Sequence, residues 1–339
     1  MKKATITDVA KLANVSKSTV SQYLNERYDY MGEDTKKRIE SAINVLGYEA
    51  NYLARSLKMK RTSTIGVIVG NILHSFSTQV IRSIEDTCHE ENIHVIVCNA
   101  DDDPVKEKKY ISMLRAKQVD GLIVFPTIAN IDIYKKLEKD NYPLVFIDRL
   151  IEGTAVDSVL LDNEAAAKLA VSHLVEKGHE RIGVITTSLD KKVTPRIERI
   201  DGYKKALRSY GITVNEEYIK AVALDNLSKE INKMMSLEEP PTALFSLNDL
   251  ALMEVLRYAK DKDIEIPNEI SLITLDDVPF ADIHSPSLTT IKQPSFEMGE
   301  YAAKLLIKKI NSEQGHQSFE IKRFLPSISI RKSCKKITK

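Results

Sequence analysis

The sequence predicts an α/β protein with a small all-α domain at its N-terminus and a body of two doubly wound parallel-sheet lobes. Three amphipathic helical stretches fall within residues 5–47. From Ile65 onward, short apolar runs alternate with helical stretches, which is the pattern of βαβ units. The body holds eight such runs, more than one six-stranded sheet accommodates, so we expect two lobes.

The N-terminal helices are predicted from their capping residues. Thr5 can cap the first helix, and Asn14 suits the left-handed conformation that a tight turn requires. Ser16 can cap a second helix over about residues 17–25, and a third helix is expected over about residues 33–46. These three helices would form one small domain ahead of the body.

The strands expected in the body are, in chain order, 65–69, 94–98, 121–125, 143–147, 181–186, 219–224, 242–246 and 270–275. In open α/β sheets, ligands bind at the carboxyl ends of the strands. Residues that follow strands are therefore candidates for a ligand site, namely Phe76, Asp148, Arg149, Asn248, Asp249, Asp276 and Asp277.

Charge is distributed unevenly along the chain. Residues 1–62 contain 12 Lys and Arg against 7 Asp and Glu, a net charge of +5. The whole chain carries +1, so the remaining residues carry −4. A basic module on a mildly acidic body is typical of a nucleic-acid-binding protein, although a solvated basic surface would give the same count.

The first two helices and their short turn fit a helix-turn-helix, whose second helix enters the DNA major groove. Val15, Val20 and Leu24 fall on the side of this helix that packs inward. The outward residues are of types that bond base edges: Lys17, Ser18, Ser21 and Gln22. A polar helix of some other small bundle would show the same pattern.

A fourth helical piece, Asn51–Lys58, precedes the body. Ala54 and Leu57 share one face of it, flanked by lysines and arginines. An exposed leucine beside a small residue and several cations suits a wedge in the DNA minor groove. The alternative is a linker whose Leu57 packs on the body.

Other classes of protein are disfavoured. No apolar run is long enough to span a membrane and no signal peptide is recognised, so a cytoplasmic protein is expected. Three cysteines are expected to be free thiols, and neither a metal site nor a cofactor is predicted. Nucleotide-binding, zinc-protease and serine-hydrolase motifs are missing from the sequence, so we do not expect an enzyme.

The stretches TITDVAKLANVSKSTVSQYLN, GYEANYLARSLK, HLVEKGHERIGVI, RIDGYKKAL and ISLITLDD resemble the LacI/GalR family of bacterial transcription regulators. The resemblance covers essentially the whole chain. It implies a helix-turn-helix domain at residues 1–50, a hinge helix and linker at 51–61, and a periplasmic-binding-protein-like body at 62–339. It also implies homodimers on pseudo-palindromic operator DNA, with a small effector between the lobes.

The resemblance assigns DNA contacts to Lys17, Ser18, Ser21, Gln22, Asn51, Ala54 and Leu57. It assigns effector binding to Phe76, Asp148, Arg149, Arg199, Asn248 and Asp276. Arg199 matches the arginine of the family's R-x-x-G-[FY] motif, and a guanidinium can bind vicinal hydroxyls or a carboxylate. Structural roles stay open, because Asn248 can cap the following helix and both aspartates can hold loops or the hinge.

Three features depart from the family pattern. HSFS, residues 74–77, replaces Asn-Pro-[FY]-[FY], which leaves Phe76 as the ring-stacking residue. Gly32 stands where a Ser or Thr cap is common. The loop before Arg199 holds more cations than a neutral sugar requires, although it can also be a solvated basic loop: Lys191, Lys192 and Arg196.

The expected function is a repressor of carbohydrate genes that a small sugar or sugar acid releases from its operator. The overall match favours regulators of 2-keto-3-deoxygluconate genes, and the basic loop would suit that ligand's carboxylate. The alternatives are a regulator triggered by a corepressor or a partner phosphoprotein, and a non-regulatory sugar-binding protein.

Overall fold

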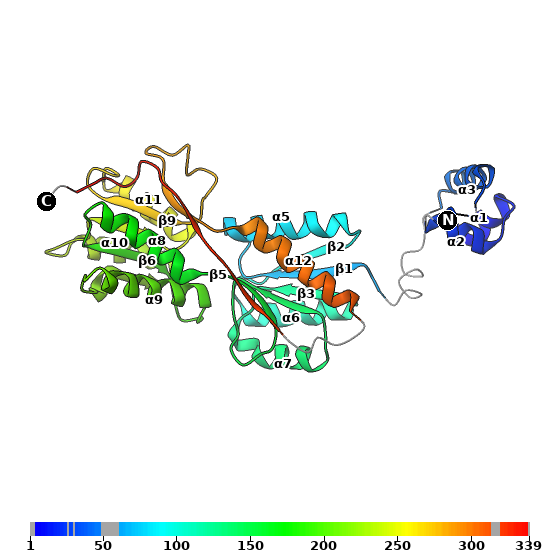
Figure 1. The fold of residues 1–339 in the computed structure, drawn as a ribbon, viewed down its shortest axis with the longest axis horizontal. Coiled ribbons are helices and arrows are strands. Elements are labelled where there is room, and N and C mark those ends of the chain that lie inside the picture. The colour runs from blue at the N-terminus through cyan, green and yellow to red at the C-terminus, as the bar shows by residue number, and fades with distance from the viewer. Residues whose placement is uncertain (1–3, 26, 30, 49–60, 313–318, 338–339) are drawn as a thin grey trace. The chain divides into compact units, whose positions relative to one another are not determined.

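The computed structural model describes residues 4–25, 27–29, 31–48, 61–312 and 319–337. The chain forms two compact units, Met1–Thr62 and Ser63–Lys339 (Figure 1). The expected hinge segment lies outside the described residues, together with its three candidates Asn51, Ala54 and Leu57.

The first unit is a bundle of three helices, α1 (Ile6–Leu12), α2 (Lys17–Leu24) and α3 (Glu33–Leu46). Its core contains one fully buried side chain from each helix, Val9, Val20 and Ile39. Val15 and Leu24 pack against this core, so the inward side predicted for the second helix is confirmed.

Local chemistry sets the ends of these helices. The Thr5 amide donates to Asp8 Oδ2 (2.9 Å) at the start of α1. Asn14 has a φ of 52°, the left-handed conformation predicted for the turn. The Thr19 amide donates to Ser16 Oγ (3.1 Å), which caps α2 as predicted. Gly47, with a φ of 54°, ends α3.

The second unit contains two lobes, each built on a six-stranded sheet. The first lobe has the strand order β11-β5-β4-β3-β1-β2, and every pairing in it is parallel. Its strands are β1 (Thr64–Val69), β2 (His94–Asn99), β3 (Gly121–Val124), β4 (Leu144–Ile147), β5 (Asp157–Leu161) and β11 (Ile321–Phe324).

Helices cover both faces of this sheet. One face packs on α5 (Ser75–Glu90) and α12 (Ser295–Asn311), through a core that includes Val80 and Leu306. The other packs on α6 (Pro104–Ala116) and α7 (Ile131–Lys139), with the short 3₁₀ helix η1 (Ile128–Asn130) before α7. Burial on both faces explains why the strands β1, β3 and β4 read as continuous apolar runs.

The second lobe has the strand order β12-β10-β9-β8-β6-β7. Its strands are β6 (Ile182–Thr187), β7 (Ile219–Val222), β8 (Ala243–Ser246), β9 (Ser271–Leu275), β10 (Thr289–Lys292) and β12 (Ser327–Ser329). All pairings are parallel except that of β10 with β12. The core on one face includes α8 (Asn163–Glu176) and α9 (Thr194–Ser209), and that on the other includes α10 (Leu224–Met235), α11 (Asp249–Asp261) and, through Tyr218, the 3₁₀ helix η2 (Glu216–Tyr218).

All eight predicted strands are present, and the doubly wound two-lobed fold is confirmed. Seven predicted strands differ from the observed ones by one residue at one or both ends. β7 ends two residues earlier than predicted, at Val222, because Ala223 is already the N-cap of α10. Four strands were not predicted, namely β5, β10, β11 and β12. β10, β11 and β12 are only three or four residues long and carry polar side chains, so they lack a continuous apolar run.

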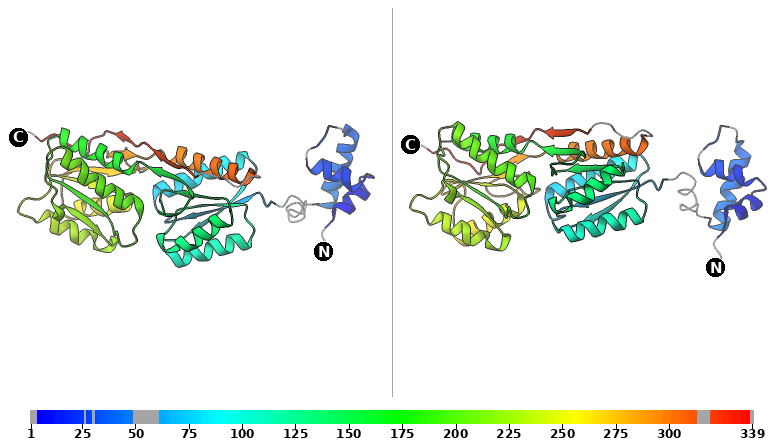
Figure 2. Two further views of the ribbon diagram at one scale, coloured as in Figure 1. Left: turned by 60° about the horizontal axis from the view of Figure 1, so that its bottom comes forward. Right: turned by 90° about the horizontal axis from the view of Figure 1, so that it is seen from below.

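The chain crosses between the lobes three times within the described residues. These crossovers run from β5 to α8, from β10 to α12, and from β11 to β12 (Figure 2). The three connections run side by side along one side of the two sheets. The opposite side is therefore the place for a ligand.

Candidate functional site

The α2 helix presents a polar surface to solvent. Lys17, Ser18 and Gln22 are exposed and Ser21 is partly buried, while Val20 faces the core. The Ser18 hydroxyl lies 2.6 Å from that of the cap residue Ser16. The four residues expected to read bases therefore sit on the accessible side of a helix fixed by its own cap.

Two effector candidates sit directly beyond strands in unusual backbone conformations. Asp148 follows β4 with a φ of 68°, and Asp276 follows β9 with a φ of 78°. Non-glycine residues adopt this conformation only where the surrounding structure holds them. Burial raises the pKa of the Asp148 carboxyl even though Arg149 and Arg199 oppose the change.

Asp276 is buried among charged and polar groups. Its Oδ1 accepts a hydrogen bond from Gln293 Nε2 (2.5 Å), whose residue belongs to the second crossover. Burial, joined by the charge of Asp249, raises the pKa of Asp276 to about 6. The hinge-holding role that sequence reasoning left open for this aspartate is therefore supported by a contact.

Arg199 is 5% exposed, and two of its nitrogens are already engaged. Its Nε donates to Asn163 Oδ1 (2.8 Å) and its Nη1 donates to the Leu247 carbonyl (2.9 Å). Burial lowers the pKa of its guanidinium, against the opposing charges of Asp276 and Asp148. These contacts bind Arg199 to the first crossover, where Asn163 begins α8.

The contact between Arg199 and Asn163 extends to the third crossover. Asn163 Nδ2 donates to Glu198 Oε2 (2.8 Å). Arg323, on β11, donates to both Glu198 oxygens, from Nη2 at 2.7 Å and from Nη1 at 3.0 Å. Arg199 thus contacts the first crossover directly and is linked through Asn163 and Glu198 to Arg323, beside the third crossover. Asp276 contacts the second crossover through Gln293.

Asn248 and Phe76 have identifiable structural contacts. Asn248 Oδ1 accepts from the Ala251 amide (2.8 Å), so this residue caps α11. Phe76 is buried on α5 with its ring edge-on to Phe125, at 6.3 Å between ring centroids.

Arg149 lies in a charged cluster that includes residues of both lobes. Its Nη2 donates to Asp102 Oδ1 (2.6 Å), and Arg196 Nη2 donates to the other oxygen of Asp102 (3.2 Å). Lys191 Nζ donates to the Asp102 carbonyl (2.9 Å). Although burial opposes ionisation, Arg149 and Arg196 hold the pKa of Asp102 below its ordinary value.

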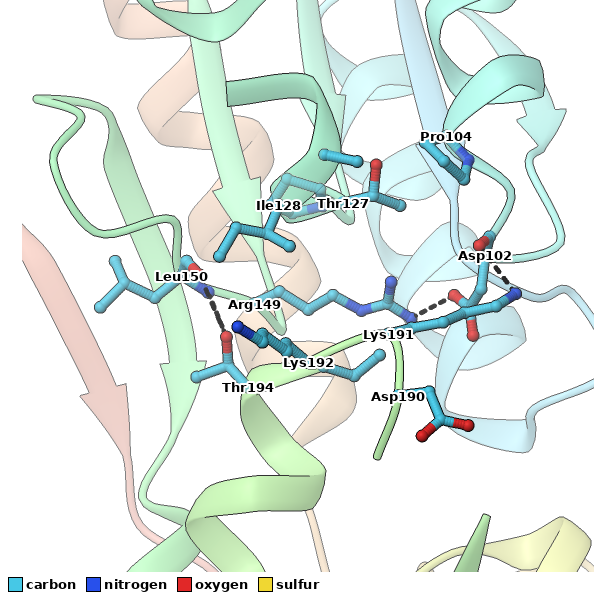
Figure 3. Close-up of a pocket in the computed structure, with 13 residues that line it drawn as sticks. Asp102, Pro104, Thr127, Ile128, Arg149, Leu150, Asp190, Lys191, Lys192 and Thr194 are labelled. Atoms are coloured by element: carbon cyan, nitrogen blue, oxygen red, sulfur yellow. Dashed lines mark hydrogen bonds and ion pairs between the residues drawn. The ribbon is translucent and has the colours of Figure 1, made fainter. Parts of the chain in front are cut away.

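This cluster borders a cavity of about 450 Å³ between the lobes (Figure 3). The first lobe contributes residues after β2, β3 and β4, and the second contributes the loop before α9. The lining residues are Asp102, Pro104, Pro126, Thr127, Ile128, Ala129, Arg149, Leu150, Asp190, Lys191, Lys192, Val193 and Thr194. Of the six effector candidates, Arg149 belongs to this lining, and the other five do not.

Sequence reasoning missed the wall of the cavity formed by Pro126–Ala129. This wall is held by Glu107 of α6, which is fully buried. The Glu107 carboxylate accepts from the Thr127 amide and hydroxyl (both 2.9 Å), from Asn130 Nδ2 (2.7 Å) and from Tyr134 Oη (2.6 Å). The signal available was position alone, because Pro126 and Thr127 come just after a predicted strand.

A second contact between the lobes involves a residue that sequence reasoning named only as a family departure. His74 Nδ1 lies 2.5 Å from Asp249 Oδ1, and the Ser75 amide donates to Asp249 Oδ2 (2.7 Å). Burial disfavours the charge of Asp249, but its bond with His74 holds the pKa of this carboxyl below its ordinary value. The start of α5 is thereby joined to the start of α11.

Two negative findings apply to the part of the chain that the structure describes. It contains no helix long and apolar enough to cross a membrane. It also contains no group of three or more His, Cys, Asp or Glu side chains arranged to hold a metal ion.

Comparison with known proteins identifies the family. Residues 5–51 match the family of bacterial regulatory proteins of the lacI type, and residues 171–334 match a periplasmic binding protein-like domain. The chain is 51% identical over 336 residues to the probable HTH-type transcriptional regulator EndR of Paenibacillus polymyxa, covering 98% of this chain and 99% of that protein. The chain belongs to the lacI family.

Other members of the lacI family agree with this assignment. The chain is 34% identical to the HTH-type transcriptional repressor PurR of Aliivibrio salmonicida, over 98% of this chain and 100% of that protein. The Lac repressor dimer bound to operator and the anti-inducer ONPF shares the fold with a TM-score of 0.83 and 24% identity, over 98% of this chain and 100% of that one. This lacI-family chain is a DNA-binding transcriptional regulator, and the relatives named here are regulators rather than enzymes.

Proposed function

We propose that this regulator represses carbohydrate genes by binding a pseudo-palindromic operator as a homodimer. A small sugar or sugar acid held between the two lobes would release it. The observation that carries the proposal is one chain with a solvent-facing polar helix α2 in its first unit and a cavity between two lobes in its second. Helix α2 would read a DNA sequence, and a small molecule in the cavity would shift the equilibrium between two states of the protein.

In this proposal, the outward residues of α2 contact base edges. Lys17 suits guanine, Gln22 suits adenine, and Ser18 and Ser21 accept either partner. Asn51, Ala54 and Leu57 would add minor-groove contacts, with Leu57 as the wedge between base steps.

The effector would bind in the cavity and against the polar groups behind it. Arg149 lines the cavity itself. Phe76, Asp148, Arg199, Asn248 and Asp276 would then act on the ligand directly or by setting the relation of the lobes. We propose 2-keto-3-deoxygluconate as the first ligand to test, because it combines sugar hydroxyls with a carboxylate.

Control of the opposite sign, in which the ligand strengthens operator binding, would use the same helix and the same cavity. A corepressor would stabilise the operator-bound state. A regulator triggered by a partner phosphoprotein would not need the cavity. We expect the protein to act in the cytoplasm and to catalyse no reaction.

The experiment has two steps. A duplex is first selected from a random pool with the full chain, and its affinity is compared with that of a scrambled duplex. Operator affinity is then measured with 2-keto-3-deoxygluconate, galacturonate, ribose and glucose 6-phosphate. Equal affinity for the selected and scrambled duplexes would exclude sequence-specific regulation. If a sugar tightens operator binding, that sugar is a corepressor. If none of the four compounds changes operator affinity, the trigger is a partner protein.

A further inference from the structure

The cavity between the lobes holds cations, and most of them already have partners. Asp102 receives hydrogen bonds from Arg149, Lys191 and Arg196 through its carboxylate or its carbonyl. Arg196 Nη1 also donates to the Ser188 carbonyl (3.0 Å). Three cations therefore donate to Asp102, and Arg149 also lies 3.5 Å from a carboxylate oxygen of Asp148.

Lys192 adds a fourth cation, and its ammonium group has neither a hydrogen bond nor an ion pair with any described residue. Its backbone is in the left-handed conformation, with a φ of 48°. Figure 3 shows its side chain reaching along the cavity toward Thr194 and Leu150, away from the lysine before it. The second acid of the lining, Asp190, already accepts a hydrogen bond from the Ser188 hydroxyl (2.6 Å).

Arg149 also retains unused donors. Its side chain is 7% exposed, and of its nitrogens only Nη2 is hydrogen-bonded within the described residues. Its Nε is buried without a hydrogen bond and lies 3.5 Å from Asp148 Oδ2, which is too far for a good one. A buried guanidinium with unused donors, on the wall of a cavity, is suited to binding an anion that arrives from solvent.

The lining also contains the apolar residues Pro126, Ile128 and Val193. A ligand that satisfies the whole cavity therefore combines an anionic group with a less polar face. A sugar ring has such a face on the side where its C–H groups point.

We propose that the cavity binds an anionic saccharide, whose carboxylate or phosphate is held by Lys192 and by the unused donors of Arg149. The assignment rests on the proposed function and deepens it, since it names the ligand class and the residues that select it. It places the anion on Lys192 and Arg149 rather than on Arg199, because two Arg199 nitrogens are bonded to Asn163 and Leu247.

The test is calorimetric titration of the full chain with matched pairs of ligands. Galacturonate is compared with galactose, and glucose 6-phosphate with glucose, beside 2-keto-3-deoxygluconate. We expect an acidic member to bind about tenfold more tightly than its neutral partner, as one charge-assisted bond allows. The pair that separates more identifies carboxylate or phosphate as the anion.

Two substitutions make the test specific. Lys192→Met should remove about tenfold of the affinity for the acid and leave the neutral sugar unchanged, and Lys192→Arg should restore most of it. Lys168→Met, at an exposed position of α8 outside the cavity, is the matched control and should change neither. Equal binding within both pairs, or an unchanged acid affinity in Lys192→Met, would overturn the proposal.

Thermal unfolding with inorganic phosphate or oxalate, against chloride at equal ionic strength, tests the anion site without any sugar. Stabilisation that Lys192→Met abolishes supports the site. If neither these anions nor any acidic sugar acts on the wild-type chain, the proposal is wrong. Sequence-specific DNA binding is measured separately. A chain that binds operator but no anion refutes this inference alone, whereas a chain that binds an anion but no specific DNA sequence refutes the proposed function alone.

Discussion

Asp276 carries its charge at an unfavourable place. The carboxyl is buried near the acid Asp249, and it accepts a hydrogen bond from Gln293. A folded-state pKa of about 6, above the ordinary 3.8, means that the native chain holds this proton more tightly than the unfolded chain. Its contribution to stability is therefore largest below about pH 4 and falls as the pH rises through 6.

Asp276→Asn should remove this pH dependence, because asparagine does not titrate and keeps an oxygen to accept from Gln293. The difference between 3.8 and about 6 corresponds to about 3 kcal/mol. We expect the free energy of unfolding of the variant, relative to wild type, to rise by up to that amount between pH 4 and pH 8. Urea unfolding at several pH values measures it, and a constant difference would show that Asp276 titrates normally.

Gln22 is the residue whose substitution best tests base reading. Its side chain is exposed on α2 and lies on the same surface as Lys17. Gln22→Ala should relax discrimination at a single operator position by about 1–3 kcal/mol, since one base contact is lost. Binding to a set of operators with single base changes measures this. A uniform loss across all of them would mean that Gln22 contacts phosphate or solvent instead.

Roles in the second unit were harder to foresee than residue positions. The sequence allowed a cap role for Asn248, which caps α11. It did not predict the partner of Arg199, which donates to Asn163, 36 positions away. Thr127 was not predicted, and Lys192 was named only as part of a basic loop. Both line the cavity between the lobes, and no local sequence pattern shows that they meet there.

At the scale of elements, α2 depends on its cap. Eight residues are too few to form a stable helix alone, so packing of Val20 and the Ser16 cap both support it. Ser16→Ala should destabilise the first unit by about 1 kcal/mol by leaving the Thr19 amide without its acceptor. Hydrogen exchange of the Thr19 and Val20 amides in the full chain measures it, and Ser16→Asp, which can still cap, should retain protection.

The elements that the sequence predicted are those with strong local signals. Buried parallel strands are recognised by their apolar runs, and capped helices by Ser, Thr, Asn or Gly at their ends. β10, β11 and β12 lack such signals, because they are short and are defined by the strands they pair with. For example, β11 begins at Ile321 and its partner β5 begins at Asp157, 164 positions earlier in the sequence. Such pairing depends on the path of the chain between lobes.

At the scale of the whole molecule, the three crossovers decide how one lobe moves against the other. Glu198 binds Arg323 of the third crossover and Asn163 of the first, beside the buried Arg199. Ligand binding that shifts Arg199 would therefore alter the contacts at two crossovers. A connected set of this kind can transmit a change at Arg199 to the contacts between the lobes.

Glu198→Gln should weaken that coupling while leaving the cavity intact. We expect the ratio of operator affinities without and with effector to fall by the equivalent of about 0.5–2 kcal/mol, with ligand affinity almost unchanged. Glu216→Gln, which removes an ion pair between Lys204 of α9 and an exposed acid away from the crossovers, is the control. An unchanged ratio in Glu198→Gln would mean that coupling runs through other contacts.

The bonds of His74 and Ser75 with Asp249, and those of Lys191 and Arg196 with Asp102, join the two lobes. Because separating the lobes has to break these bonds, we expect the opening of the protein rather than diffusion to limit how fast a ligand enters. We therefore expect the observed rate of ligand association to level off at high ligand concentration instead of rising in proportion to it. Ligand escape would be slow for the same reason, so that a brief supply of effector would leave a response that outlasts it.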